Sequence, residues 1–221
     1  MKLFSLDLNR YNYTNSKYLL QERHIFHMNY HEMKKKLKKA LDKERYEHTK
    51  GVMYTAASLA MAHGYSIENA MIAGLLHDCA KCIPNNEKIN LCQKYHIIIT
   101  SVERTNPSLL HAKLGAYFAE AEYKVTNPEI LHAIKVHTTG EPDMNILDKI
   151  IFIADYIEPG RDKAPNLDKV REIAFKDLNG CMAQILRDTL IYLKQGHGSI
   201  DPTTELTYKY YKQYEEANYD I

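Results

Sequence analysis

The chain has 221 residues, of which 45% are apolar, and its 29 basic and 28 acidic side chains give a formal net charge of +1. This length predicts one domain with a sizeable core, and no apolar run is long enough to span a membrane. The balanced charge gives no electrostatic reason to expect a nucleic acid or a membrane surface as partner. The four cysteines follow no secretory signal, which predicts a cytoplasmic protein with reduced thiols.

Residues 1–27 differ from the rest of the chain. They are polar and tyrosine-rich, and their short apolar patches keep no helical period. We expect them to form a peripheral extension or to precede a functional start at Met28; a helix packed on the core is the alternative. The domain itself is predicted to cover residues 28–215.

From Met28 onwards, apolar residues recur every three or four positions and strand-like alternation is missing, which predicts an all-α helical bundle. Ser66 is a candidate N-cap for a helix that ends near His77. Asn106 and Asn127 each precede a proline, the pattern of an N-cap followed by proline at the first helical position. Further helices are predicted through the basic stretch KKKLKKAL, over residues 44–63, 107–123, 128–139, 144–158 and 167–194 (with a break near Gly180), and from about Thr203.

Several helical segments direct an ionisable side chain towards the core. His48 shares its face with Val52 and Ala56, and Asp155 follows Ile151 by four residues inside an apolar run. The same periodicity selects His77, Asp78, His111 and His137. Burying two carboxylates beside several imidazoles is costly unless a cation compensates, so the sequence predicts a metal site in the core.

The stretch GLLHDCAKCIP, residues 74–84, also carries Cys79 and Cys82 at the spacing of a redox or zinc motif. A redox pair would open a helix after a strand, and a zinc site would need a second such pair; the sequence predicts neither. Two ordinary reduced thiols are therefore the preferred interpretation. His132 lies off the inward-facing stripe of its helix and is expected to be a structural or surface residue.

The order of His48, His77-Asp78 and Asp155 on successive helices resembles the HD superfamily of metal-dependent phosphohydrolases. One branch, the YqeK family, is more similar still over about residues 30–214. The similar motifs are Arg45-Tyr-Glu-His48, His77-Asp-Cys-Ala-Lys81, Leu110-His111-Ala, His137-Thr-Thr-Gly140, Ala154-Asp-Tyr-Ile-Glu-Pro-Gly-Arg161 and Pro202-Thr-Thr-Glu-Leu-Thr207. The resemblance implies symmetrical hydrolysis of diadenosine tetraphosphate to two ADP. Hydrolysis of dNTPs or guanosine 3′-pyrophosphates by another HD phosphohydrolase, and nucleotide binding without turnover, stay open as alternatives.

The resemblance also implies roles for individual residues. The metal ligands would be His48, His77, Asp78 and Asp155. A set of nitrogen and oxygen donors suits iron, manganese or zinc, and the resemblance favours iron, as one ion or two. His111 and His137 could bind a second metal or hydrogen-bond phosphate directly. The implied substrate contacts are His48, Asp78, His111, His137, Asp155, Tyr156, Arg161, Pro202, Thr203, Thr204, Glu205, Leu206 and Thr207.

Two further roles concern the reaction. Asp78 could orient or deprotonate the attacking water, while Lys81, one helical turn further on, could neutralise a phosphate oxygen. The expected partners are a dinucleoside polyphosphate as substrate and ADP as product. A homodimer is plausible from the resemblance alone.

Overall fold

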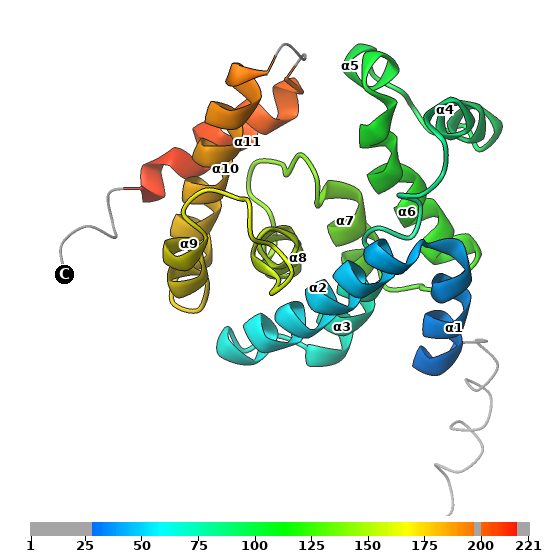
Figure 1. The fold of residues 1–221 in the computed structure, drawn as a ribbon, viewed down its shortest axis with the longest axis horizontal. Helices are drawn as coiled ribbons and strands as arrows, with labels where there is room; N and C mark the ends of the chain where they lie inside the picture. Colours follow the sequence, from blue (N-terminus) through cyan, green and yellow to red (C-terminus); the bar gives the residue numbers. More distant parts are fainter. Residues whose placement is uncertain (1–27, 197–199, 216–221) are drawn as a thin grey trace, which may run out of the picture.

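The computed structural model describes residues 28–196 and 200–215, and within these residues helices are the only regular secondary structure (Figure 1). The α-helices are α1 (Tyr30–Ala40), α2 (Lys43–Ala62), α3 (Ile67–Leu76), α4 (Asn85–Lys94), α5 (Ser101–Thr105), α6 (Leu110–Ala121), α7 (Pro128–Val136), α8 (Ile146–Ile157), α9 (Leu167–Ala174), α10 (Leu178–Gln195) and α11 (Pro202–Tyr211). Two short 3₁₀ helices cover Pro107–Leu109 and Lys212–Tyr214. The prediction of an all-α fold is confirmed.

Side chains at the helix starts explain many of the boundaries. Asn29 and Asn145 each form a capping box, in which the asparagine oxygen accepts a backbone N–H three residues on. Ser66 caps α3, and Asn127 caps α7 ahead of Pro128, as the sequence predicts. These bonds satisfy backbone donors that have no partner inside the helix.

One apolar core holds the helices together from α1 to α11. It extends from Met33 to Tyr211, and α8 contributes an almost continuous buried run that includes Ile150 and Ile153. In Figure 1, α8 lies between the α2–α3 pair and α10, so residues of α8 meet residues of α2 and α3 across the core. A smaller cluster beneath α4, which includes Cys92 and Leu114, anchors that helix.

One predicted helix start differs in detail and one predicted break is misplaced. Helical structure begins at Pro107 after Asn106, as predicted, but as a 3₁₀ turn, and α6 follows from Leu110. The Asn106 side chain makes no cap bond, because its oxygen accepts the Ser108 hydroxyl at 2.5 Å. The break in the predicted helix over 167–194 lies at residues 175–177 rather than at Gly180. There the Asp177 carboxylate accepts the Asn179 N–H and starts α10, which contains Gly180. Helices α4 and α5 have no individual counterpart in the sequence analysis.

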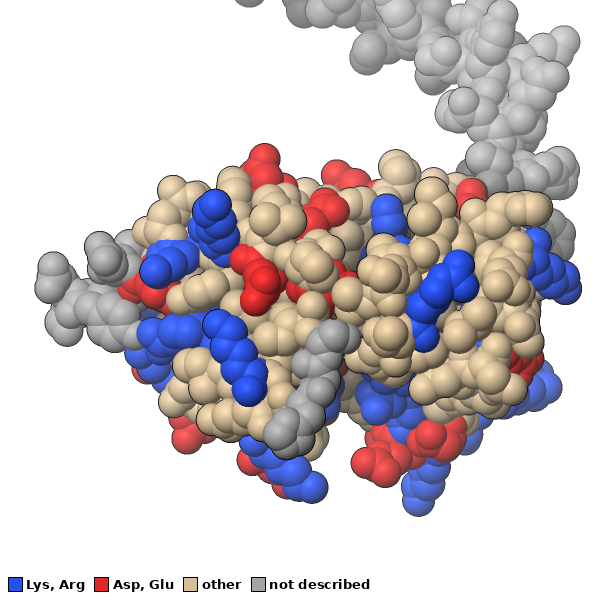
Figure 2. Space-filling view, turned by 90° about the horizontal axis from the view of Figure 1, so that it is seen from above, with Lys and Arg blue, Asp and Glu red and all other residues tan. Residues whose placement is uncertain are grey.

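The surface shows the mixed charge that the composition predicts. Basic and acidic side chains are interspersed on the face drawn in Figure 2. Among the described residues, no helix combines the length and the apolar character that crossing a membrane requires. The prediction about residues 1–27 lies outside the described residues and stays a prediction.

Candidate active site

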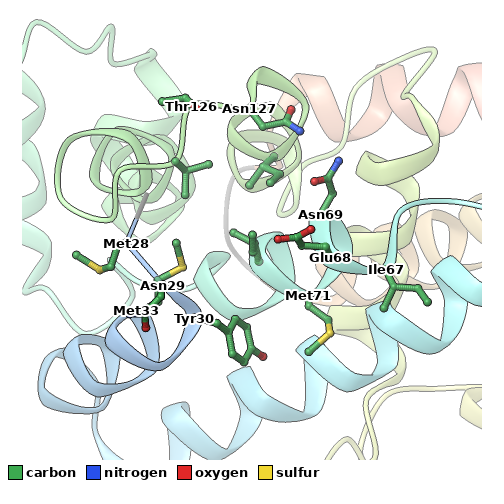
Figure 3. A pocket seen from close by; sticks show the side chains of 13 residues that line it. Met28, Asn29, Tyr30, Met33, Ile67, Glu68, Asn69, Met71, Thr126 and Asn127 are labelled. Atoms are coloured by element: carbon green, nitrogen blue, oxygen red, sulfur yellow. The ribbon is translucent and has the colours of Figure 1, made fainter. Parts of the chain in front are cut away.

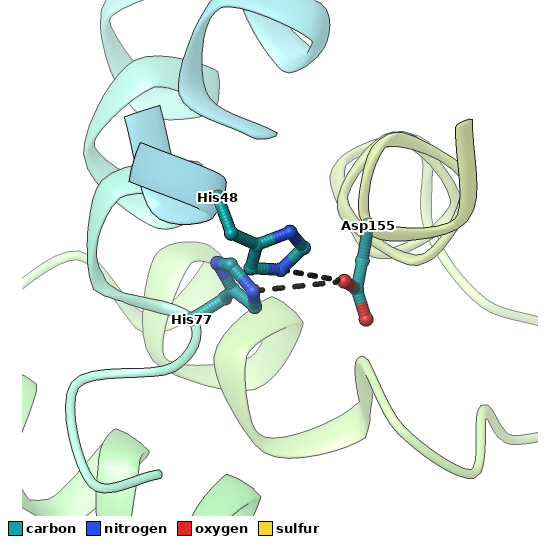
Figure 4. Close-up of side chains that lie close together, drawn as sticks. All are labelled: His48, His77 and Asp155. Atoms are coloured by element: carbon teal, nitrogen blue, oxygen red, sulfur yellow. Dashed lines mark ion pairs between the residues drawn. The ribbon is translucent and has the colours of Figure 1, made fainter. Parts of the chain in front are cut away.

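Three helices bring His48, His77 and Asp155 together (Figure 4). His48 extends from α2, His77 is the C-terminal cap of α3, and Asp155 extends from α8. Nε2 of His48 lies 3.0 Å from Oδ1 of Asp155, and Nε2 of His77 lies 3.8 Å from the same oxygen. The two imidazoles therefore converge on one carboxylate, as the metal-ligand prediction requires.

Asp78 occupies the centre of the site and is buried. Its Oδ2 lies 3.5 Å from Nε2 of His77 and 3.9 Å from Nε2 of His48. Its Oδ1 lies 3.1 Å from Nε2 of His111, on α6, and 3.6 Å from Nε2 of His137, at the end of α7. One carboxylate thus lies between two pairs of histidines. We call these four histidines, Asp78 and Asp155 the histidine–aspartate cluster.

The other ring nitrogen of each histidine is held by a hydrogen bond. Nδ1–H donates to a backbone carbonyl in three of them and to a carboxylate in the fourth. The acceptors are Gly74 O for His77 (2.7 Å), Ser108 O for His111 (2.5 Å), Ile134 O for His137 (2.7 Å) and Glu158 Oε1 for His48 (3.0 Å). A neutral imidazole that donates through Nδ1 presents a lone pair on Nε2, so all four lone pairs face the cluster.

This arrangement of lone pairs needs a cation. Nε2 of His111 lies 3.1 Å from Nε2 of His137, and two acceptors at that separation repel each other. Three buried atoms of the cluster have no hydrogen-bond partner, namely His48 Nε2, His77 Nε2 and Asp78 Oδ1. Buried polar atoms without partners are rare, and a nitrogen–oxygen donor set fits a divalent transition metal. The residues present therefore fit the metal that the sequence analysis predicts.

The protonation states agree with a cation-binding role. Burial acts to raise the pKa of the Asp78 carboxyl, but positive charge at a protonated His77 and N–H donation from His111 and His137 hold that pKa well below its usual range. Asp155 behaves in the same way: N–H donation from His48 and the positive charges of a protonated His77 and of Arg161 outweigh burial and lower its pKa. A bound cation would stabilise the carboxylates in place of these protons and leave the imidazole lone pairs free to bind it. Burial lowers the pKa of His111 to about 4, although Asp78 acts against this shift. At neutral pH both carboxylates are ionised and His111 is neutral.

Three cationic side chains surround the cluster. Nη2 of Arg161 donates to Oδ1 of Asp155 at 2.7 Å, and Nη1 of Arg45 donates to Oδ2 of Asp78 at 2.9 Å. Nζ of Lys81 lies 3.2 Å from Nε2 of His111 and 3.8 Å from Oδ1 of Asp78. Arg161 and Lys81 remain 40% and 34% exposed, so both can also reach a ligand that approaches from solvent.

A cleft of about 460 Å³ opens beside the cluster, and we call it the first cleft. His137 and Asp155 line it together with Tyr156, Arg161 and Thr204. Of the segment 202–207, only Thr204 lines this cleft. Thr203 lines a separate cleft of about 170 Å³. Thr207 is buried, and its hydroxyl donates to the Thr203 carbonyl. The remaining residues of the segment, Pro202, Glu205 and Leu206, are exposed.

Glu158 is a site residue that the sequence analysis missed as a functional group. It is 4% exposed, holds Nδ1 of His48 through Oε1, and accepts the Gly160 N–H at 2.7 Å through Oε2. A Cβ on Gly51 would collide with Oε2 of Glu158, so the glycine one turn after His48 leaves room for this carboxylate. The sequence does contain a signal for the pair of His48 and Glu158. A glycine, Gly51, lies three residues after His48, and an acidic residue, Glu158, lies three residues after Asp155.

The cysteines and His132 lie outside the cluster. All four cysteines are free; Cys79 is buried, whereas Cys82 is exposed and donates to the Asp42 carboxylate. Among the described residues, no group suited to metal binding contains a cysteine. Nδ1 of His132 lies 3.0 Å from both oxygens of Asp148, and its Nε2 lies 3.0 Å from Glu141. His132 therefore links three elements by ion pairs away from the cluster.

Another cleft, of about 920 Å³, lies between the start of α1, the start of α3 and the start of α7 (Figure 3). Met28, Tyr30, Met33, Met71 and Ile72 give it an apolar lining. None of the predicted site residues line it. Its volume alone therefore does not mark it as the place of the chemistry.

Comparisons with known proteins identify the family. A model of the HD domain matches residues 45–160, which places the chain in the HD-domain family. A symmetrical bis(5′-nucleosyl)-tetraphosphatase of Bacillus subtilis is 39% identical over 174 residues, which are 79% of this chain and 92% of the relative. Its counterpart in Staphylococcus aureus is 34% identical over 170 residues, 76% of this chain and 87% of the relative. Within the HD-domain family the chain belongs to the symmetrical bis(5′-nucleosyl)-tetraphosphatases, the YqeK family, which confirms the resemblance.

A solved structure agrees with this assignment. The crystal structure of an HD superfamily hydrolase from Clostridium acetobutylicum, described as involved in NAD metabolism, superposes with a TM-score of 0.81 at 35% sequence identity. The match covers 84% of this chain and 97% of that chain. The helical arrangement that positions the cluster is thus shared with a known HD protein.

Proposed function

We propose that this chain is a metal-dependent hydrolase that cleaves diadenosine tetraphosphate at its central anhydride link and releases two ADP. One observation carries the proposal: four imidazole lone pairs and two ionised carboxylates converge where Arg161 and Lys81 can receive phosphate oxygens. The activity of the relatives supports the choice of substrate.

We assign the metal to His48, His77, Asp78 and Asp155, with iron favoured over manganese or zinc. A second ion would lie between Asp78, His111 and His137, where two lone pairs face each other at 3.1 Å. When bound, such an ion supplies Lewis-acid stabilisation of phosphoryl oxygens and makes water more acidic. The alternative, in which His111 and His137 donate hydrogen bonds to phosphate, is less consistent with Nδ1 donation to backbone carbonyls, because a neutral ring then has no second N–H.

The catalytic groups of the chain itself are Asp78 and Lys81. As an ionised carboxylate, Asp78 accepts a hydrogen bond from water and so orients the water for attack on phosphorus. Lys81 lines the first cleft and neutralises charge that develops on phosphoryl oxygens. Arg161 acts likewise, and its bond to Asp155 fixes the guanidinium at the edge of the cluster.

We assign the first cleft to one nucleotide half of the substrate. Tyr156, Arg161 and Thr204 line it, and His137 and Asp155 form the side next to the cluster. A nucleoside and its first two phosphates held there would place the inner phosphorus of that half at the cluster. Attack at this atom releases the other half as ADP, so symmetrical cleavage follows from the position of the cleft.

The test is product analysis with purified protein. Incubation with diadenosine tetraphosphate in oxygen-18 water, followed by chromatography and mass spectrometry, should give ADP alone, with the label in one of each two ADP molecules. ATP together with AMP would reject symmetrical cleavage. Parallel incubations with dNTPs and with a guanosine 3′-pyrophosphate test the alternative substrates, and binding without products would indicate a regulator.

Two further expectations belong to the proposal. A cytoplasmic location is consistent with the free cysteines. A homodimer rests on the resemblance to the family, and light scattering of the purified protein measures it.

A further inference from the structure

A second cleft, of about 720 Å³, opens on the other side of Arg161. Its lining includes Lys43, Arg45 and His48 from α2, and Pro159 and Gly160 after α8. Glu44, Gly160 and Arg161 line both this cleft and the first cleft, so the two clefts meet at these residues.

The histidine–aspartate cluster lies where the clefts meet. His48 lines the second cleft, whereas His137 and Asp155 line the first cleft. Nε2 of His48 lies 3.0 Å from Oδ1 of Asp155, so residues that line the two clefts are in contact at the cluster. The cluster is thus flanked by two clefts.

We propose that the second cleft binds the second nucleotide half of the dinucleoside tetraphosphate, an inference that rests on the proposed function. The substrate has two identical halves joined at the bond that breaks. With one half in the first cleft and the central link at the cluster, the other half must leave the cluster in a different direction. The second cleft is the opening that receives it, and its volume lies within the range of small-molecule sites.

The lining of the second cleft suits a nucleoside diphosphate. Lys43 and Arg161 provide positive charge for the two phosphates of this half. The exposed carboxylates of Glu44 and Glu47 can accept hydrogen bonds from the exocyclic amino group of adenine. The half bound here is the leaving group in the reaction, so these contacts hold the leaving ADP until it departs into solvent.

Lys43 distinguishes the two clefts. It is exposed at the first position of α2 and lines the second cleft but not the first. Arg45 is a poorer probe because its guanidinium is bonded to Asp78 within the cluster. Replacing Lys43 therefore tests the second cleft without disturbing the first cleft or the cluster.

The experiment is calorimetric titration of the protein, purified without chelator, with two ligands. One is diadenosine tetraphosphate with a methylene group in place of the central bridging oxygen; the other is ADP. Lys43→Ala should weaken binding of the methylene analogue about tenfold, the effect of losing one hydrogen bond to a charged group. It should leave the binding of ADP in the first cleft, which Lys43 does not line, unchanged. Lys43→Glu should weaken analogue binding further, and Lys38→Ala, at an exposed lysine of α1 outside both clefts, should change neither ligand.

Two outcomes would overturn the proposal. If Lys43→Ala binds the analogue as tightly as the wild type, the second half does not contact this cleft. If the affinities for ADP and for the analogue fall by the same factor, Lys43 acts on the first half. Failure of the proposed function looks different: the wild type would show the predicted binding pattern but release no ADP from diadenosine tetraphosphate.

Discussion

Oε1 of Glu158 lies 3.0 Å from Nδ1 of His48, and Glu158 itself is buried behind the imidazole. A carboxylate in this position fixes the tautomer of the histidine, because Nδ1 must carry the proton and Nε2 must carry the lone pair. It also increases the basicity of Nε2, as carboxylate partners of metal-binding histidines do. We therefore expect Glu158 to act as a positioning residue through His48.

Replacing Glu158 by glutamine tests this role. The amide keeps the shape of the side chain but loses the charge, so the orientation and basicity of His48 should both weaken. We expect metal affinity to fall by about 10- to 100-fold. Competition against a fluorescent chelator measures this affinity independently of turnover. Glu172→Gln, which removes an exposed carboxylate paired with Lys176, is the matched control and should leave metal affinity unchanged.

Gly51→Ala should disturb the same pair from the opposite side. The added methyl group would overlap Oε2 of Glu158, and this side chain can move away only by giving up its bonds to Nδ1 of His48 and to the Gly160 N–H. We expect a loss of about 1–3 kcal/mol in the free energy of unfolding, together with weaker metal binding. Thermal unfolding and metal titration measure the two effects. At Gly196 an added Cβ would make only an ordinary contact of 3.5 Å, so Gly196→Ala should be close to neutral.

The helices and most of the cluster can be predicted from the sequence because both depend on local periodicity. His48 lies on the same face as Val52 and Ala56, and these two residues are fully buried in the structure. Once a face is known to be buried, each ionisable residue on it must have a partner. That argument selects the inward-facing histidines and carboxylates without any knowledge of which helices meet.

Features that depend on distant contacts escape the same reasoning. Glu158 follows α8 at the start of a turn, a position that the sequence alone would place at the surface. It is buried because α2 approaches it at Gly51. The missing cap bond of Asn106 has a local cause instead: the Ser108 hydroxyl, two residues away, occupies the side-chain oxygen that would otherwise cap the helix. The sequence also does not predict which residues of segment 202–207 face the first cleft, the core or solvent, because this depends on how α11 packs against α10.

Asp78→Ala should reduce turnover by roughly 100- to 1000-fold, because Asp78 contacts both pairs of histidines at once. By contrast, the double variant Cys79→Ser and Cys82→Ser should retain most of the activity. Burial raises the pKa of the Cys79 thiol, so this cysteine is a poor nucleophile at neutral pH. Steady-state rates with metal content measured on the same samples separate the two cases. An inactive double serine variant with normal metal content would favour the redox interpretation instead.

Removal of residues 1–27 should leave the fold and the rate largely unchanged. A chain that starts at Met28 keeps the capping box between Asn29 and Glu32, and so keeps the start of α1. A shorter variant that starts at His31 loses this cap and should unfold more easily by about 1 kcal/mol. Denaturant unfolding of both variants measures the difference. A large loss of stability in the first variant would show that the extension packs on the domain.

Arg161→Ala should weaken substrate binding and slow turnover without changing the products. The guanidinium is bonded to Asp155 and lines both clefts, so its loss removes a phosphate contact at the point where the two halves of the substrate meet. We expect the KM for diadenosine tetraphosphate to rise by about 10- to 100-fold, the effect of losing a hydrogen bond between charged groups. In the proposed mechanism the cluster sets the position of attack, so ADP should remain the product in chromatography. Arg161→Lys keeps the positive charge but not the bidentate geometry of the guanidinium. Its KM should therefore lie between those of the wild type and of Arg161→Ala. ATP and AMP from Arg161→Ala alone would show that Arg161, rather than the cluster, determines which anhydride link is cleaved.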